Sequence, residues 1–144
     1  MKFNAIIDID RISLYERAFE EAKLIYDKNS TRRNRTLEEI LEACLYGHAA
    51  EVYLMDIGFN NDPRPYKDLL EKDGTPIEVK VTEGEYYVPY VLERAERAAS
   101  EPWRDYPKKL YVFIGNRQSL DYHLHGIYVW DGKNFCVQPE INGV

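Results

Sequence analysis

Cysteines and long apolar stretches are the two features that this sequence has least of. Its two cysteines, Cys44 and Cys136, are too few for a disulfide framework, so we expect reduced thiols. No apolar run approaches the roughly 18–20 residues that cross a membrane. The first residues, Met1 to Asn4, lack the apolar segment of a signal peptide. Together these absences predict a soluble, cytoplasmic protein that does not work in a membrane.

The sequence also lacks an excess of positive charge. It has 19 Lys and Arg against 25 Asp and Glu, a formal net charge of −6. Any contact with nucleic acid must therefore rely on local groups of basic residues. The densest such group runs from Lys28 to Arg35 and includes Arg32 and Arg33. Two interpretations stay open for it: a solvated loop between two helices, or an arm that contacts phosphates.

Internal repeats, low-complexity segments and interdomain linkers are absent as well. A chain of 144 residues that is 44% hydrophobic is long and apolar enough for one domain with a buried core. Residues 1–144 are therefore expected to form a single domain.

Hydrophobic spacing and capping signals predict three helices. The segment from Ser13 to Glu16 has the form of a capping box, and it opens a helix that ends near residue 27. A second capping box, from Thr36 to Glu39, opens a helix that ends near Gly58. A third helix is expected at about residues 86–99.

Strands are predicted around the remaining turn signals. They are expected at residues 3–9, 66–71, 75–82, 109–115, 126–130 and 134–138. Residues 59–65 carry the Asn, Asp and Pro that are typical of a loop. This order of elements indicates an α/β (or α+β) domain with a mixed sheet.

The turn Lys72-Asp73-Gly74 decides whether two carboxylates can meet. With a three-residue loop that ends in a left-handed Gly74, Asp68 lies directly across from Glu78. A two-residue turn would put these two side chains on opposite faces of the sheet. The longer loop is favoured because Glu78 and Lys80 share one face of an apolar strand and need partners there.

Such a meeting of carboxylates favours metal-assisted chemistry. Two close carboxylates repel each other unless a proton or a cation lies between them. Oxygen ligands of this kind suit Mg²⁺, which keeps several waters and accepts phosphate oxygens. Lys80 beside them could orient or deprotonate a water, or stabilise charge on a phosphate. The set of Asp68, Glu78 and Lys80 therefore fits the hydrolysis of a phosphodiester.

The segment Tyr66–Asp68, followed across the turn by Glu78–Lys80, resembles the Asp…Glu-x-Lys signature of PD-(D/E)XK nucleases. The segment Gly47–Leu54 resembles the helix that completes the site in many members of that family with an acidic residue, which here is Glu51. The resemblance covers about residues 36–82. The chain departs from the signature at Lys67, where the pattern has proline.

The resemblance implies a fold and an activity. The fold is a restriction-endonuclease-like mixed β-sheet flanked by α-helices, and the activity is that of a magnesium-dependent deoxyribonuclease. Asp68, Glu78 and the backbone carbonyl of Val79 would bind Mg²⁺, or Mn²⁺ as a substitute. Glu51 would act on the metal directly or through a water, and Lys80 would serve the nucleophile. DNA is the expected partner, and a homodimer is expected by analogy. Further phosphate contacts are expected from Arg32, Arg33, Arg35 and Lys67.

Several residues keep a second interpretation. Asp62 is a rival to Asp68 as the first carboxylate. His48 lies one turn before Glu51 and is either near the site or an ordinary hydrogen-bonded histidine. Three tyrosines could stack on bases or pack in the core or an interface; they are Tyr86, Tyr87 and Tyr90.

Two other functions also remain open at this point. One is a catalytically inactive binding or assembly module on the same fold, which would suit the acidic balance of the chain. The other is a nuclease directed at RNA.

Overall fold

The structure, a computed structural model, describes residues 2–3, 16, 18–24, 26, 36–64, 67–116 and 122–139. Most of the first predicted strand and the three arginines at positions 32, 33 and 35 lie outside these residues. None of the helices in the described part combines the length and the apolar composition that crossing a bilayer requires.

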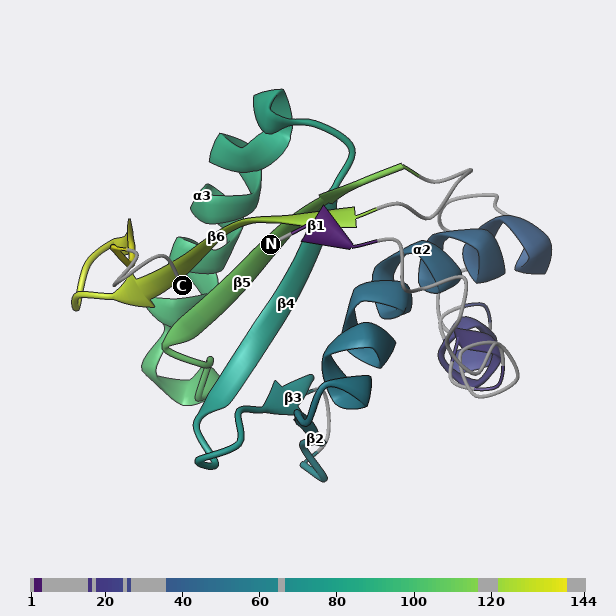
Figure 1. Ribbon diagram of the computed structural model, residues 1–144, viewed down its shortest axis with the longest axis horizontal. Helices are drawn as coiled ribbons and strands as arrows, with labels where there is room; N and C mark the ends of the chain where they lie inside the picture. Colours follow the sequence, from purple (N-terminus) through teal and green to yellow (C-terminus); the bar gives the residue numbers. More distant parts are fainter. Residues whose placement is uncertain are drawn as a thin grey trace.

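A mixed sheet of seven strands forms the centre of the described chain (Figure 1). The strands follow the order β1-β6-β5-β4-β3-β2, and β7 pairs with β6. β4 and β5 are parallel, and all other neighbours are antiparallel. The strands are β1 (Lys2–Phe3), β2 (Asn60–Asn61), β3 (Leu69–Leu70), β4 (Pro76–Thr82), β5 (Lys109–Gly115), β6 (Tyr122–Trp130) and β7 (Phe135–Val137). The predicted α/β class with a mixed sheet is confirmed.

Helix α2 (Leu37–Asp56) begins and ends where its capping signals predict. The hydroxyl of Thr36 accepts a hydrogen bond from the N–H of Glu39, and the Glu39 side chain accepts one from the N–H of Thr36, both at 3.1 Å. This closes the predicted capping box. Gly58 follows the helix with φ at +115°, a left-handed conformation that suits glycine.

Two helices cover opposite faces of the sheet. The buried face of α2, including Ala49 and Ala50, packs against Ile77 and Val79 of β4. Helix α3 (Val88–Ala99) follows the 3₁₀ turn η2 (Glu85–Tyr87). It packs on the other face, over Leu110, Val112 and Ile114 of β5 (Figure 1). This matches the third helix that was predicted at about residues 86–99.

The alternation of side chains along β4 separates its apolar and charged residues. Ile77 and Val79 are buried beneath α2. Glu78 pairs with Leu110 and Lys80 with Val112, so both charged residues belong to the α3 face of the sheet. The prediction that Glu78 and Lys80 share one face of the strand is confirmed.

The described residues between 16 and 26 are helical and lie against the first half of α2. Ala18 and Ala22 are fully buried there beside Ile40 and Cys44. This agrees with the predicted first helix, whose capping residue Ser13 lies outside the described part.

The strand around Asp68 is shorter than predicted. It was expected at residues 66–71, but β3 contains only Leu69 and Leu70, and the predicted loop at 59–65 contributes the short strand β2. The ladder stops because the carboxylate of Asp68 takes the hydrogen bond of the next N–H of β4, that of Val79. From Glu78 onward, this edge of β4 has no strand beside it in the described chain, and α2 lies alongside (Figure 1).

Two tyrosines fasten α2 to the sheet. The Tyr46 hydroxyl donates to the carbonyl of Gly115 at 2.9 Å, and the Tyr122 hydroxyl donates to the carbonyl of Tyr46 at 2.8 Å. Their rings lie 5.7 Å apart between centroids. A Cβ on Gly115 would come within 2.1 Å of the Tyr122 ring, so this position has room only for glycine.

Gly115→Ala should therefore destabilise the fold by about 1–3 kcal/mol, because the Tyr122 ring is buried and cannot move aside freely. Gly47→Ala is the matched control: nothing described lies within 4 Å of its added Cβ, and alanine favours a helix by up to about 1 kcal/mol. Urea unfolding measures both. Equal stability of the two variants would contradict the conclusion that only glycine fits beside Tyr122 at position 115.

Candidate active site

The hairpin between β3 and β4 has the predicted three-residue turn. The N–H of Gly74 donates to the carbonyl of Glu71 at 2.8 Å, and the N–H of Glu71 donates to the carbonyl of Thr75 at 2.8 Å. Gly74 has φ at +91°, which places it in the left-handed region. Glu71 thus faces Thr75 across the turn, as the longer loop requires.

This turn sets the register that brings Asp68 to Glu78. Leu69 pairs with Ile77 and Leu70 with Pro76, so the next position of the same register puts Asp68 across from Glu78. The two carboxyl groups are close enough for Asp68 to raise the pKa of Glu78. The predicted meeting of these two side chains is therefore present in the structure.

Asp68 is held by the backbone of the opposite strand. Its Oδ2 accepts a 2.8 Å hydrogen bond from the N–H of Val79. A strand residue directs its N–H and C=O to the same side, so the carbonyl of Val79 faces the same edge of β4. Two kinds of oxygen, carboxylate and carbonyl, therefore face the edge that β3 leaves open.

Glu78 is mostly buried, and its carboxyl holds a proton more firmly than an ordinary glutamate does. Burial raises the pKa of its carboxyl to about 9, assisted by the hydrogen bond and the negative charge of Asp68. The Lys80 ammonium acts the other way and lowers this pKa, while the charge of Glu51 raises it. The pair of Asp68 and Glu78 therefore shares a proton in the absence of a cation.

Glu51 reaches the site from the buried half of α2. The residue is only 4% exposed, and its Oε2 lies 3.0 Å from Nδ1 of His48, one turn earlier. Nε2 of His48 in turn contacts the carboxylate of Glu21 from the preceding helical segment. His48 thus contacts two carboxylates beside the hairpin. Of its two interpretations, the one that places it near the site agrees with the structure.

All four residues of the predicted catalytic set line one cleft between α2 and the edge of β4. The cleft has a volume of about 360 Å³. Glu51 comes from α2, Asp68 from the end of the hairpin arm, and Glu78 and Lys80 from β4. The full lining is Glu21, Ile40, Ala43, Cys44, Gly47, His48, Glu51, Asp68, Glu78, Val79, Lys80 and Val81. Segments far apart in sequence therefore present carboxylates and an amine to one space.

The donors in this cleft fit a hard divalent cation, although they are not gathered as a ready metal cage. No group of three His, Cys, Asp or Glu side chains that could hold a metal ion exists among the described residues. Asp68 binds the Val79 N–H, and Glu51 contacts His48. The oxygens of Asp68, Glu78 and the Val79 carbonyl nevertheless suit Mg²⁺, which needs few protein ligands because it keeps its waters.

Tyr106 is a member of the site that the sequence analysis did not find. It follows the 3₁₀ turn η3 (Pro102–Arg104), and its hydroxyl interacts with Glu78 and Asp68. Burial, together with the charges of Glu78 and Asp68, raises the pKa of its hydroxyl, so the hydroxyl stays protonated and acts as a donor. No local pattern marks this residue, because its contact joins two distant segments.

Asp62, the rival carboxylate, has a different role. It is 4% exposed and pairs with Arg64 at 2.8 Å. The hydrogen bond from Arg64 lowers the pKa of Asp62 below its ordinary value. Asp62 does not line the cleft, so it stabilises its own loop and leaves Asp68 as the partner of Glu78.

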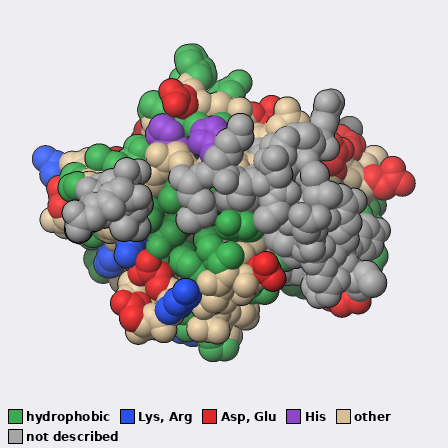
Figure 2. Space-filling view, in the orientation of Figure 1, with side chains coloured by type: hydrophobic (Ala, Val, Ile, Leu, Met, Phe, Trp, Pro, Cys, Tyr) green, Lys and Arg blue, Asp and Glu red, His purple; other side chains and the backbone are tan. Residues whose placement is uncertain are grey.

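The basic residues expected to contact phosphates are only partly described. The Lys67 ammonium donates to the carbonyls of Asp105 at 2.6 Å and Arg104 at 3.3 Å, which ties the hairpin arm to the loop after η3. Arg32, Arg33 and Arg35 lie outside the described residues. Among the coloured side chains in Figure 2, Lys and Arg are scattered between acidic groups.

Comparison of the chain with known protein families, with curated proteins and with solved structures finds no match. The function therefore has to be argued from the site, because a fold class alone hosts many activities.

Glu78→Gln should stabilise the cation-free protein relative to the wild type, and this difference in the free energy of unfolding should grow as the pH rises. A carboxyl whose pKa is raised in the folded state favours folding less and less between its unfolded pKa, 4.5, and its folded pKa, about 9. At pH about 8 the variant should be more stable than the wild type by roughly 2–4 kcal/mol, and at pH about 5 by little. Urea unfolding in EDTA measures this difference.

Glu42→Gln, an exposed change on α2, is the control and should show no such growth with pH. A constant gap between Glu78→Gln and the wild type across this pH range would contradict a shared proton.

Proposed function

We propose that this chain is a Mg²⁺-dependent endonuclease that hydrolyses DNA phosphodiester bonds and has the restriction-endonuclease-like fold of PD-(D/E)XK nucleases. The observation that carries the proposal is the cleft in which Asp68 and Glu78 meet across a hairpin while Lys80 and Glu51 line the same space. The mixed sheet with α2 and α3 on opposite faces supports the proposed fold.

The electrostatics of the carboxyl pair support a cation. A proton shared by Asp68 and Glu78 relieves their repulsion. A divalent cation can do the same more completely, and it releases that proton on binding. Asp68, Glu78 and the Val79 carbonyl would hold the ion, and Mn²⁺ would substitute for Mg²⁺ because both prefer oxygen ligands.

Each remaining side chain has a role that follows from its position. When bound, the cation would supply polarisation of the phosphate and acidity to a water. Lys80, on the same face of β4 as Glu78, orients the attacking water or neutralises charge that develops on the phosphate. Glu51, aligned by His48, positions a water on the α2 side of the cleft. Tyr106 orients the Glu78 carboxyl from the loop after η3.

DNA is the proposed substrate, and a homodimer is the proposed assembly. Arg32, Arg33, Arg35 and Lys67 would give secondary contacts to DNA phosphates. A homodimer would let two sites cut two strands. An inactive binding module and an RNA-directed nuclease are the alternatives, and a cleavage assay separates them from the proposal.

With Mg²⁺ the wild-type protein should nick supercoiled plasmid DNA, and EDTA should abolish the nicking. Asp68→Asn, Glu78→Gln and Lys80→Ala should each lower the cleavage rate by about 10²-fold or more, since each removes a ligand or the cationic group. Labelled DNA and RNA of one sequence, run in parallel, identify the preferred backbone.

Asp73→Asn is the matched control, because it makes the same chemical change at the tip of the same hairpin. Asp73 binds the N–H of Thr75 at 3.0 Å, a turn contact that asparagine can also make, so this variant should keep full activity. Loss of cleavage in Asp73→Asn, or persistence in Glu78→Gln, would count against the assigned site. A folded protein without any cleavage would favour the inactive module.

Mg²⁺ should also raise the melting temperature of the wild type independently of any activity. A ligand at about 100 times its Kd stabilises a fold by about 2.7 kcal/mol. Glu78→Gln should lose this response because its amide cannot replace the carboxylate. Thermal melts with increasing Mg²⁺ measure the effect, and Ala substitution of Lys80 should leave it in place. An identical Mg²⁺ response in the wild type and Glu78→Gln would place the ion elsewhere.

A further inference from the structure

Three tyrosines at the start of α3 are exposed rather than packed in the core. Tyr86, Tyr87 and Tyr90 are 74%, 52% and 55% exposed. Tyr86 meets Tyr87 edge-on with centroids 5.4 Å apart, and it lies 6.2 Å from Tyr90. Their exposure excludes packing in the core, so stacking on bases and packing in an interface remain as the two interpretations.

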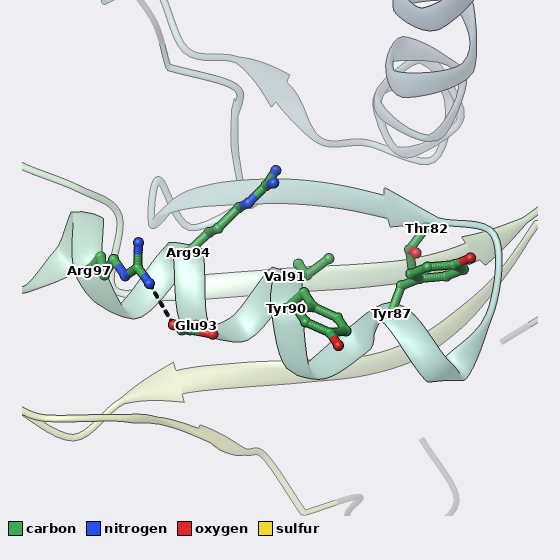
Figure 3. A pocket seen from close by; sticks show the side chains of 7 residues that line it. All are labelled: Thr82, Tyr87, Tyr90, Val91, Glu93, Arg94 and Arg97. Atoms are coloured by element: carbon green, nitrogen blue, oxygen red, sulfur yellow. Dashed lines mark hydrogen bonds and ion pairs between the residues drawn. The ribbon is translucent and has the colours of Figure 1, made fainter.

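Two of these rings line a groove that also contains arginine. The groove has a volume of about 610 Å³ and is formed by Thr82 at the end of β4 and by one side of α3. Figure 3 shows the rings of Tyr87 and Tyr90 at one end of the groove and the arginines at the other. The lining is Thr82, Tyr87, Tyr90, Val91, Glu93, Arg94 and Arg97.

The two arginines differ in their electrostatic state. Arg97 pairs with Glu93 at 2.6 Å, so its charge is compensated. Arg94 extends away from that pair and over β4 (Figure 3). No carboxylate of the described chain pairs with Arg94. The groove thus presents two aromatic faces at one end and the uncompensated positive charge of Arg94 at the other.

Neighbouring residues of β4 line the groove and the cleft of the candidate active site. Lys80 and Val81 line the cleft with the carboxylates, and Thr82 lines the groove. Lys80 and Thr82 point to the same face of the strand and lie roughly 6.6 Å apart along it. A nucleic-acid strand that leaves the site along this face of β4 would therefore enter the groove directly.

We infer that this groove binds unpaired nucleotides next to the scissile phosphate, so that the substrate class is DNA with a single-stranded segment. Open tyrosine faces stack on bases only when those bases have left a duplex. Arg94, at the other end of the groove, supplies a contact to a phosphate of the same strand. The inference rests on the proposed nuclease function for the identity of its ligand, and it adds the choice of strand structure.

The test is a binding measurement in EDTA, where no cleavage can interfere. Fluorescence anisotropy compares a labelled single strand of about 12 nucleotides with the blunt duplex of the same sequence. The wild type should bind the single strand more tightly. Combined Tyr87→Ala and Tyr90→Ala should weaken single-strand binding by at least about fivefold for each ring lost.

Two controls separate stacking and charge from general damage. Combined Tyr87→Phe and Tyr90→Phe keeps both rings, so its single-strand affinity should stay within about twofold of the wild type. Arg94→Gln should flatten the dependence of log affinity on log salt by roughly 0.7. Lys133→Gln, an exposed change in the turn between β6 and β7, should leave that slope unchanged.

Equal affinity for single strand and duplex, or an alanine variant that binds like the wild type, overturns the inference. Failure here is distinguishable from failure of the nuclease. If the protein cleaves blunt duplex with Mg²⁺ and the tyrosine changes have no effect, the proposed nuclease function stands and the proposed binding of single strands in the groove is rejected. Tyrosine-dependent binding of single strands without any cleavage sustains the groove as a nucleic-acid site and rejects the nuclease.

Discussion

The hydrogen bond from the N–H of Val79 to Oδ2 of Asp68, 2.8 Å long, is the contact on which the site depends. It ends the β3 ladder and holds one carboxylate at the open edge of β4. The left-handed Gly74 makes this possible, because its three-residue turn sets the register of the hairpin. A slip by one residue would send Glu78 to the opposite face, and the carboxyl pair would not exist.

The packing of the sheet makes this pair electrostatically unusual. Ile77 and Val79 anchor β4 beneath α2, while Tyr46 fastens the same helix to the far end of β5. Glu78 lies on the other face of the same strand, where its own burial raises its pKa. The proton that Glu78 keeps occupies the place in which a divalent cation would balance the same charges. Fold stability and metal affinity are therefore opposed at this residue, a common situation at functional sites.

Local signals in the sequence were sufficient for much of this structure. The capping box at Thr36, the turn at Gly74 and the alternation around Glu78 each involve residues close in the chain, and each predicted its element correctly. Contacts between distant segments have no such signal. The interaction of Tyr106 with Glu78 was therefore not foreseen. The predicted length of β3 was wrong because the side chain of Asp68 replaced the backbone as hydrogen-bond acceptor.

The central claim is that Asp68 and Glu78 share a proton which a divalent cation displaces. Calorimetric titration of Mn²⁺ into the wild type at pH about 7.5, in buffers with different ionisation enthalpies, counts the protons released. The account predicts one ion bound per chain with roughly one proton released, and loss of both in Asp68→Asn. Binding without proton release, or equal binding by Asp68→Asn, would contradict it.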